Sequence, residues 1–219
     1  MNHRRPSRPR LGGPIGGAAF FALVLIGMSG CFTGERPTLA HEPSTGFPAV
    51  DAVVDRVNSL GDAVYTADYD VVTTFDNVTT LARASQSGVS RRSLTVGDVR
   101  YLVDGSSTRT CTVSTGDCVD TIDASRVSDV QMTPDFFGTS LSARLRRDAE
   151  VTVGDPTAST EEIQGQTATC TAIPVDGATN TYCVLDNGVL ARLDAGDLVV
   201  TMTGYEPGAD ASLFTPDGG

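Results

Sequence analysis

Three hydrophobic patterns follow one another along the chain. An apolar run extends from Ala18 to Met28. From Val50 to Leu60, apolar residues recur every three or four positions, which is the spacing of one helix face. From Tyr65 to Phe75, apolar and polar residues alternate, which is typical of a strand with one buried side. The pattern therefore predicts an apolar leader, an amphipathic helix of about 14 residues, and then β-structure.

Further β-rich stretches fill most of the remaining chain, and the short turns between them indicate an antiparallel meander. We expect these strands at residues 78–84, 89–96, 99–103, 108–113, 149–153, 162–174, 180–185, 189–193 and 198–205. Two helices interrupt the series: Asp123 can cap a short helix that runs to Met132, and Thr133 with Pro134 opens a second helix. The fold class we predict is α+β, with one curved antiparallel sheet whose concave face packs on helices.

The leader has the pattern of a bacterial lipoprotein signal peptide. Four arginines between positions 4 and 10 precede the apolar run, which is too short to span a bilayer as a stable helix. Small residues, Ser29 and Gly30, lie directly before Cys31. We expect cleavage before Cys31 and acylation of that cysteine, palmitate included, because several acyl chains hold a protein on a membrane durably. The alternative is an ordinary secreted protein with a free cysteine near its new terminus.

The domain organisation follows from these features. Residues 1–30 are the predicted signal peptide, and residues 31–48, rich in proline and glycine, form a lipidated flexible tether. Residues 49–219 form one domain, which we place at the extracytoplasmic face of the cell membrane. After cleavage, 12 arginines face 27 acidic residues, a formal charge of −15. This charge repels nucleic acid and anionic headgroups, so we expect no nucleic-acid partner and attachment through the lipid alone.

The composition argues against most enzyme chemistry. All 16 basic residues are arginine, so mechanisms that need a lysine amine are excluded. The two histidines are His3, in the predicted leader, and His41, in the predicted tether. Catalytic triads and zinc sites therefore lack their usual ligands. We expect no enzyme activity, no cofactor and no metal site, although spacing alone does not exclude chemistry by carboxylates only.

The four remaining cysteines are expected to be oxidised, because exported proteins form disulfides. Four cysteines allow three connectivities, and spacing alone does not choose among them. Asp176 and Gly177 form a preferred two-residue turn, and counting outward from it places Cys170 opposite Cys183 in a close antiparallel pair. Between Cys111 and Cys118, residues 114–117 have the composition of a hairpin turn. Pro174 lacks an N–H donor, so its strand must lie at an edge or be bulged there.

Several of these residues occur together in a known family. The order runs from the cysteine after small residues through the helix and Tyr65–Tyr69 to Gly165, Cys170, Tyr182, Cys183 and Gly188–Arg192. In this order the chain resembles actinobacterial LprG-type lipoproteins of the LolA-like lipoprotein-carrier superfamily, over most of residues 50–216. The resemblance implies a curved half-barrel that wraps helices and holds acyl chains between sheet and helices. The best-known carriers lack the cysteine pairs.

We therefore expect the protein to bind or transfer lipid-like molecules, with a lipid or glycolipid as ligand. The candidate cavity lining consists of apolar residues on the first helix, the second helix and the first strand; an ordinary solid core would use the same residues. These are Val53, Val57, Leu60, Phe136, Phe137, Leu141, Leu145, Tyr65, Tyr69, Val71 and Phe75. The main alternative is a sensor or scaffold module of the same architecture that contacts a membrane or cell-envelope protein.

Overall fold

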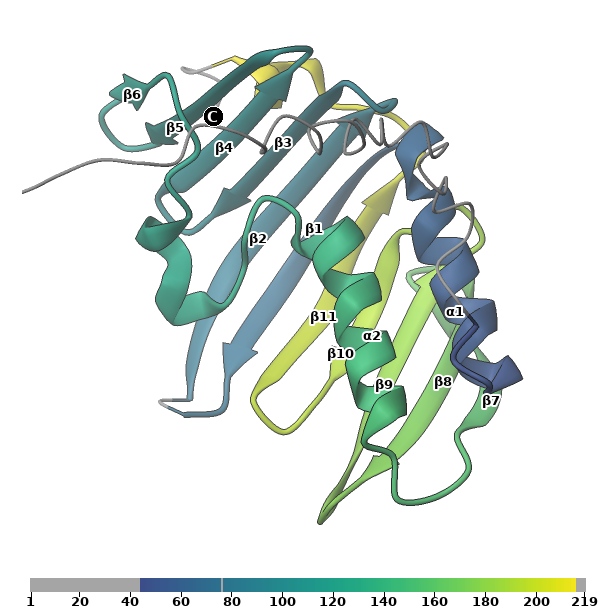
Figure 1. The fold of residues 1–219 in the computed structure, drawn as a ribbon. Coiled ribbons are helices and arrows are strands. Elements are labelled where there is room, and N and C mark those ends of the chain that lie inside the picture. The colour runs from purple at the N-terminus through teal and green to yellow at the C-terminus, as the bar shows by residue number, and fades with distance from the viewer. Residues whose placement is uncertain (1–43, 76, 216–219) are drawn as a thin grey trace, which may run out of the picture. The chain divides into compact units, whose positions relative to one another are not determined.

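An open antiparallel sheet of 11 strands forms the body of the protein. The computed structural model describes residues 44–75 and 77–215. The strand order is β6-β5-β4-β3-β2-β1-β11-β10-β9-β8-β7. Chain neighbours β1 to β6 pair in sequence on one side, chain neighbours β7 to β11 pair in sequence on the other, and the β1/β11 pair joins the two series (Figure 1). The meander predicted from the alternating pattern is confirmed.

The elements have the following bounds. The strands are β1 Val64–Thr73, β2 Val78–Ser87, β3 Arg91–Val96, β4 Val99–Asp104, β5 Ser107–Thr112, β6 Cys118–Val119, β7 Thr157–Ile163, β8 Gln166–Val175, β9 Ala178–Leu185, β10 Leu190–Asp194 and β11 Leu198–Glu206. The helices are α1 Pro48–Asn58 and α2 Leu141–Glu150, with short 3-10 segments η1 Ser59–Asp62, η2 Ala124–Val130 and η4 Ala211–Phe214 and a π-helical turn η3 Phe136–Ser140.

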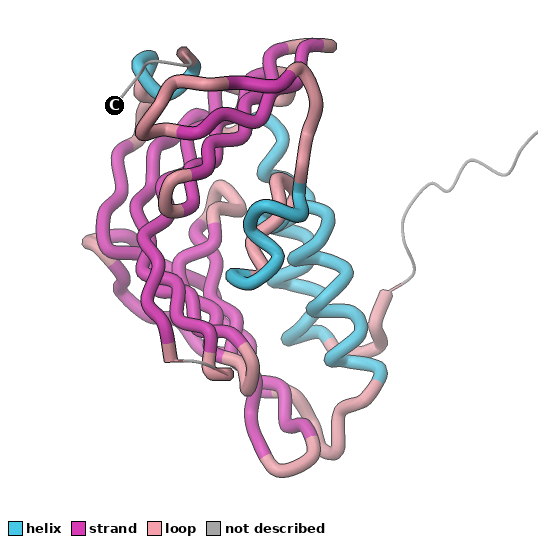
Figure 2. Tube along the Cα trace, turned by 90° about the vertical axis from the view of Figure 1, so that its left-hand side faces the viewer, coloured by secondary structure: helices cyan, strands magenta, loops and turns pink. Residues whose placement is uncertain are grey.

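Helices α1 and α2 lie on the concave face of the curved sheet (Figure 2). Helix α1 begins with Pro48, whose fixed φ suits the first helical turn. Its apolar stripe, which includes Val50, Val53 and Val57, is buried as the spacing predicted. Because the sheet is open and the helices fill its concave side, the predicted α+β class with a curved sheet wrapping helices is confirmed.

Two strand predictions are wrong. Residues 149–153 form no strand, because α2 continues to Glu150 and a turn follows in which Val151 and Val153 are exposed. Residues 162–174 are not one strand, because the chain reverses at Gln164 and Gly165, which both have positive φ and connect β7 to β8. Gln164 is an uncommon residue for that conformation, so the turn left little sequence signal.

The two inserted helices are less regular than predicted. Asp123 does cap the first, with its Oδ1 accepting the Ser125 N–H at 3.2 Å, but the segment is a 3-10 helix. The second does not start at Pro134. Gly138 has φ −128° and ψ −108°, which breaks the helix, and α2 begins at Leu141. The prediction of a continuous second helix is therefore wrong.

The predicted signal peptide, most of the tether and Cys31 lie outside the described residues. Among the described residues, none of the helices has the length and apolar content needed to cross a membrane.

Candidate functional site

The concave face of the sheet is where the sequence placed a ligand cavity. Nearly all of the proposed lining residues are buried there. The buried ones are Val53, Val57, Leu60, Tyr65, Tyr69, Val71, Phe136, Phe137, Leu141 and Leu145. Phe75 is the exception: its exposed fraction is 101%, because β1 ends at Thr73 and Phe75 lies in the turn beyond it. The prediction that Phe75 lines the interior is wrong.

Aromatic side chains pack closely together in the concave interior. The Phe137 ring lies 4.8 Å from the Tyr69 ring and 5.2 Å from the Phe136 ring, measured between centroids. A cavity of about 30 Å³ remains at this position, and Leu60, Tyr65 and Phe137 are among its lining residues. That volume is about the share of a single water molecule in the liquid. Ligand pockets measure about 300–1,000 Å³, so this cavity has no room for an acyl chain.

The rim of this cavity is polar. Gln86 on β2 donates from Nε2 to the carbonyl oxygens of Leu60, at 2.6 Å, and Gly61, at 3.1 Å, and so fixes the end of the first helical segment. Arg92 on β3 also lines the cavity, and its Nη1 lies 3.9 Å from Oδ1 of Asp135. The segment that carries Phe136 and Phe137 thus also supplies the nearest acid to Arg92. Sequence reasoning missed Gln86 and Arg92 because a polar residue on the inner side of a strand has no distinct pattern.

A buried polar cluster joins α2 to the sheet. Oδ2 of Asp148 accepts hydrogen bonds from the Tyr182 hydroxyl and, at 2.7 Å, from Nδ2 of Asn180. Arg144, on the same helix, donates to the Tyr182 oxygen at 3.3 Å and forms an ion pair with Asp197. Burial first, and then the hydrogen bond to Asp148, raise the pKa of Tyr182 well above its ordinary value. The cluster joins α2 to β9 through Asp148, although Oδ1 of Asn180 is buried without a hydrogen-bond partner.

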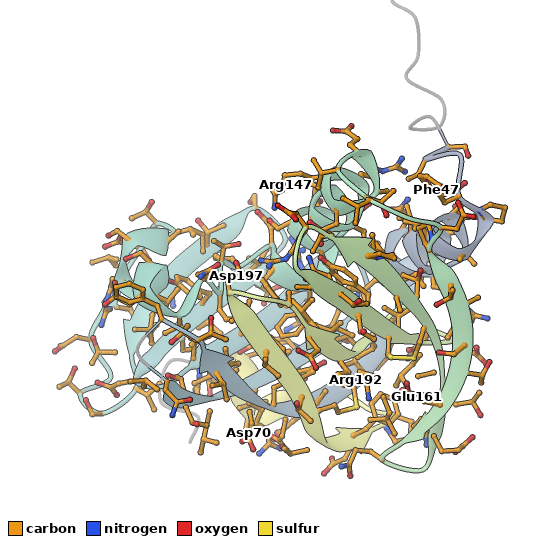
Figure 3. All side chains as sticks on the ribbon, turned by 90° about the horizontal axis from the view of Figure 1, so that it is seen from below. Phe47, Asp70, Arg147, Glu161, Arg192 and Asp197 are labelled. Atoms are coloured by element: carbon orange, nitrogen blue, oxygen red, sulfur yellow. A yellow bond between two sulfur atoms is a disulfide. The ribbon has the colours of Figure 1, made fainter. Side chains whose placement is uncertain are left out.

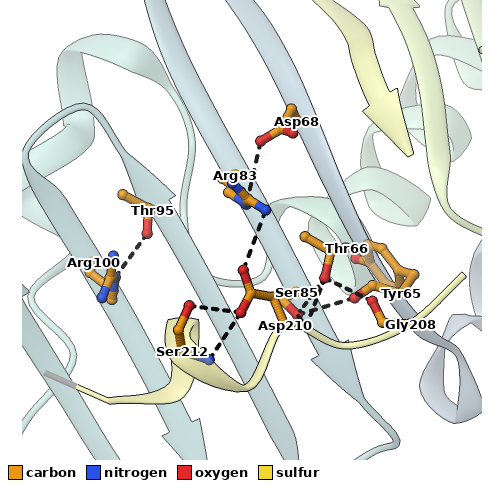
Figure 4. A network of polar contacts seen from close by, with 10 residues as sticks. All are labelled: Tyr65, Thr66, Asp68, Arg83, Ser85, Thr95, Arg100, Gly208, Asp210 and Ser212. Atoms are coloured by element: carbon orange, nitrogen blue, oxygen red, sulfur yellow. Dashed lines mark hydrogen bonds and ion pairs between the residues drawn. The ribbon is translucent and has the colours of Figure 1, made fainter. Parts of the chain in front are cut away.

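The outer face of β1 to β4 is crossed by residues 207–215, which we call the strap (Figure 4). The Asp210 N–H donates to the hydroxyl oxygens of Thr66, at 2.9 Å, and Ser85, at 3.1 Å. The Asp210 carboxylate lies 3.4 Å from Nη2 of Arg83.

The strap also covers a buried arginine. Arg100 is only 2% exposed, and its Nη1 donates to the Thr215 carbonyl at 3.1 Å. Burial lowers the pKa of Arg100. Phe214 lies under the guanidinium of Arg91, 4.5 Å from ring centroid to Cζ. The surface under the strap is therefore polar, unlike the concave core.

Both predicted disulfides are present. Cys111 and Cys118 have Cα atoms 4.1 Å apart, and Cys170 and Cys183 have Cα atoms 4.0 Å apart. The register counted from Asp176 and Gly177 is confirmed, because Val175 pairs with Ala178 and Cys170 with Cys183. Pro174 lies two residues beyond Ala172, the last β8 residue that pairs with β7, so its strand is at a local edge, as expected.

An ion pair covers the second disulfide. Arg192 on β10 donates to both carboxylate oxygens of Glu161 on β7, at 2.8 and 2.9 Å, across the two strands that carry Cys170 and Cys183 (Figure 3). The Glu161 carboxylate and the two sulfurs lie within 4.8 Å of one another. Because the sulfurs are bonded to each other, they cannot serve as metal ligands.

Two larger hollows are open to solvent on the surface of the sheet. One, of about 440 Å³, lies at β1 to β3, where Leu81 is 69% exposed. The other, of about 370 Å³, lies beside the β7–β8 turn and Tyr205. Neither contains any of the predicted lining residues except Tyr69, which contributes to the first.

Comparisons with known proteins give no family. No family model matches the chain, and no curated protein matches it. Solved structures that are similar include the Pseudomonas aeruginosa MucA/MucB complex, at 12% identity and a TM-score of 0.47, over 74% of this chain and 58% of that chain. A second is MucB in complex with MucA(peri), at 13% identity and a TM-score of 0.46, over 73% and 56%. A third is PNGF-II, at 12% identity and a TM-score of 0.35, over 69% and 29%.

The chain thus spans less than two thirds of the length of these structures. Because the TM-scores lie below 0.5, the similarities support no conclusion about ligand or partner.

Proposed function

We propose that the protein is a membrane-tethered module of the cell envelope that acts by contacting a protein partner. The observation that supports this proposal is the close packing of Tyr69, Phe136 and Phe137 in the concave interior, where a cavity of about 30 Å³ remains beside the rings. A module of this kind needs only a stable outer surface and an anchor. The predicted acylation of Cys31 supplies the anchor, and the acidic domain charge keeps the module away from anionic headgroups.

The module proposal includes no catalytic step. The acids of the two polar clusters described above have partners within the chain: Asp148 accepts from Asn180 and Tyr182, and Asp210 pairs with Arg83. The chain contains no lysine, and both histidines lie in the predicted leader and tether. We therefore propose a binding role without enzyme activity, on the architecture that the LolA-like resemblance led us to expect.

A second candidate is a lipid carrier whose interior opens. One specific observation favours it: the residues that fill the concave space near the rim come from an irregular segment, not from a regular helix. Phe136 and Phe137 lie in the π-helical turn, next to Asp135, which faces Arg92 at 3.9 Å. If residues 131–140 moved away, an apolar space with a cation at its rim would remain, which suits a lipid or glycolipid with a negative headgroup.

Native mass spectrometry separates the two candidates. The protein would be measured as the Cys31→Ala variant, purified from a host membrane background. The module proposal expects the mass of the chain alone. Lipid bound at near one-to-one stoichiometry would contradict the module and support the carrier.

Two variants make this measurement sharper. Phe137→Ala enlarges the space at the rim, whereas Leu193→Ala removes a similar apolar group from a fully buried site on β10. If the protein is a lipid carrier, the amount of lipid bound per chain changes in Phe137→Ala and stays the same in Leu193→Ala. A module binds no lipid in either variant, because both only lose packing.

The anchor is tested separately. Wild-type protein is expected in the membrane fraction with acyl groups on Cys31, detected by mass spectrometry of its N-terminal peptide. Cys31→Ala is expected in the soluble extracytoplasmic fraction. An unmodified Cys31 in the membrane fraction would contradict the tether.

A further inference from the structure

Strand β7 is a free edge of the sheet. It has seven residues, and within the described part of the chain it pairs only with β8 (Figure 1). The opposite edge strand, β6, has two residues and is joined to its neighbour by a disulfide. A long edge strand presents unpaired backbone groups to other chains, and proteins usually protect it with proline, bulges or charged side chains. Strand β7 has no proline and no bulge, and of its two charged residues Glu161 is paired with Arg192, which leaves Glu162.

The register identifies the free backbone groups. The β7–β8 turn has two residues, Gln164 and Gly165, so the closing pair Ile163–Gln166 is a hydrogen-bonded pair. By alternation, the odd-numbered residues of β7 bond to β8, and the N–H and C=O groups of Ala158, Thr160 and Glu162 point away from the sheet. No backbone partner for these three residues exists among the residues that the structure describes.

We propose that β7 pairs with β7 of a second copy of this chain, antiparallel and centred on Thr160. In this register Thr160 faces the same residue of the second copy, and Ala158 faces Glu162 in both directions. The three outward-pointing residues of each copy then form three hydrogen-bonded pairs, with two backbone bonds in each pair. The two sheets become one continuous sheet across a two-fold axis, the symmetry of most homodimers.

The charges along the edge are compatible with this register, and a register shifted by one residue in each copy would pair Glu162 with Pro156, which has no N–H to donate. Glu162 faces a small neutral residue, Ala158, and Glu161 faces Ser159, so no acid lies directly opposite another acid. Glu161 is already neutralised by Arg192 at 2.8 Å. A register centred on Glu162 would place two carboxylates opposite each other, which is destabilising. The central pair of threonines is a favourable cross-strand pair.

The high acidic charge of the domain opposes the association of two copies, so we expect pairing to strengthen with added salt, which screens this repulsion. Pairing of one short strand is weak in dilute solution, but copies tethered to one membrane meet at a high effective concentration. The pairing itself does not depend on the partner or on the lipid discussed above.

Cysteine cross-linking in membranes of cells that express the full chain tests the proposal. Thr160→Cys is expected to cross-link to itself under mild oxidation, because directly paired Cα atoms lie within disulfide reach. Ala158→Cys and Glu162→Cys are each expected to cross-link weakly alone and strongly when the two variants are co-expressed. Thr201→Cys, exposed on the outer face of β11, reports random collisions. Equal cross-linking at all positions, or none above Thr201→Cys, would overturn the proposal.

A pair of charge variants tests the register independently. Thr160→Lys and Ala158→Lys add the same charge to the same exposed strand. Thr160→Lys places like charges opposite each other, and we expect at least a several-fold loss of dimer in analytical ultracentrifugation of the detergent-purified full chain. Ala158→Lys faces Glu162 of the other copy, and we expect a gain of similar size. Equal changes in both variants would show an effect of net charge only and would refute the proposed register.

Discussion

The two halves of the sheet cover their concave faces in different ways. Strands β8 and β9 lie under the regular helices α1 and α2, and Ile173 on β8 and Tyr182 on β9 are completely buried. Strands β1 to β4 lie largely under the irregular segment of residues 120–140, and a small cavity with a polar rim remains there. The regular helices pack on the sheet through continuous apolar stripes. The irregular segment instead packs on it through two large aromatic rings, those of Phe136 and Phe137. The half with regular helices is thus the rigid part of the fold, and the other half is where any opening would start.

The outer faces differ as well. In the β7–β10 region, a disulfide under the Arg192–Glu161 ion pair links two strands covalently. On β1 to β4, the strap is held by polar contacts alone at Asp210 and by the packing of Leu213 and Phe214. We therefore expect changes in the α1–α2 half to reduce global stability, and changes in the other half to act locally.

The largest effect is expected at the contact of Gly188 with α1. Gly188 has φ +83°, and a Cβ atom there would lie 2.1 Å from the Arg56 carbonyl oxygen, which is backbone. Gly188→Ala must displace the helix or the turn, so we expect the free energy of unfolding to fall by more than about 3 kcal/mol. Urea unfolding measures this change.

Gly177→Ala is the matched control for that variant. Gly177 also has a positive φ, +74°, but a Cβ atom there would have no atom within 4 Å apart from those of its own chain neighbours. We expect a loss of about 1 kcal/mol, from the backbone conformation alone. Similar losses in the two variants would show that α1 is not rigidly locked against the sheet.

One tyrosine in each half of the sheet allows a direct comparison of the two halves, and we expect losses of stability of intermediate size. The Tyr182 hydroxyl donates to the buried Asp148 carboxylate on α2, and the Tyr101 hydroxyl donates to the Asp123 carbonyl at 3.0 Å, beside η2. Tyr182→Phe is expected to cost about 2–3 kcal/mol, because a buried charged acceptor loses a donor. Tyr101→Phe is expected to cost about 1 kcal/mol, because water can replace the lost bond. Equal costs in thermal unfolding would contradict the contrast between the halves.

The smallest effect is expected at the strap and depends on pH. Hydrogen bonds from the Ser212 hydroxyl and the Ser212 N–H lower the pKa of Asp210 below its ordinary value. A lowered folded pKa contributes stability above the unfolded pKa of about 4, and that stability is lost as the pH falls through the folded value. We expect the backbone amides of residues 210–215 to lose protection from hydrogen exchange below about pH 4, before the amides of α2 do.

Asp210→Asn should weaken this pH dependence. Asp104→Asn, which affects another exposed acid on the same outer face, should leave it unchanged. If α2 lost protection at the same pH as the strap, the strap would not be an independently weak segment.

Much of the fold could be predicted from local patterns. The stripe from Val50 to Leu60 and the alternation in β1 each reflect burial of one side of one element, which the chain records residue by residue. The Asp176–Gly177 turn predicted the register, and with it the Cys170–Cys183 pairing, because glycine readily adopts the positive φ that Gly177 has, +74°. The same reasoning missed the turn at Gln164, where tertiary pairing of β7 with β8 outweighs the weak preference of glutamine.

The candidate site was harder to predict, because whether side chains fill the space between the sheet and the helices depends on three-dimensional packing. Phe137 and Tyr69 have the same hydrophobic character whether they line a cavity or fill it, and only the distance between their rings, 4.8 Å, decides between the two. Phe75 continued the alternation of β1, yet the strand ended two residues earlier and left the ring in solvent.

The sequence by itself predicted the first helix, most of the strands and the antiparallel order of neighbouring strands, because each depends on residues that are near one another in the chain. The tertiary structure alone decided that β1 pairs with β11, that the strap covers Arg100, and that Phe137 packs against Tyr69 and Phe136 in the concave interior. Those features depend on side chains from distant segments meeting at close-packed density, and no local pattern encodes the volume that they leave.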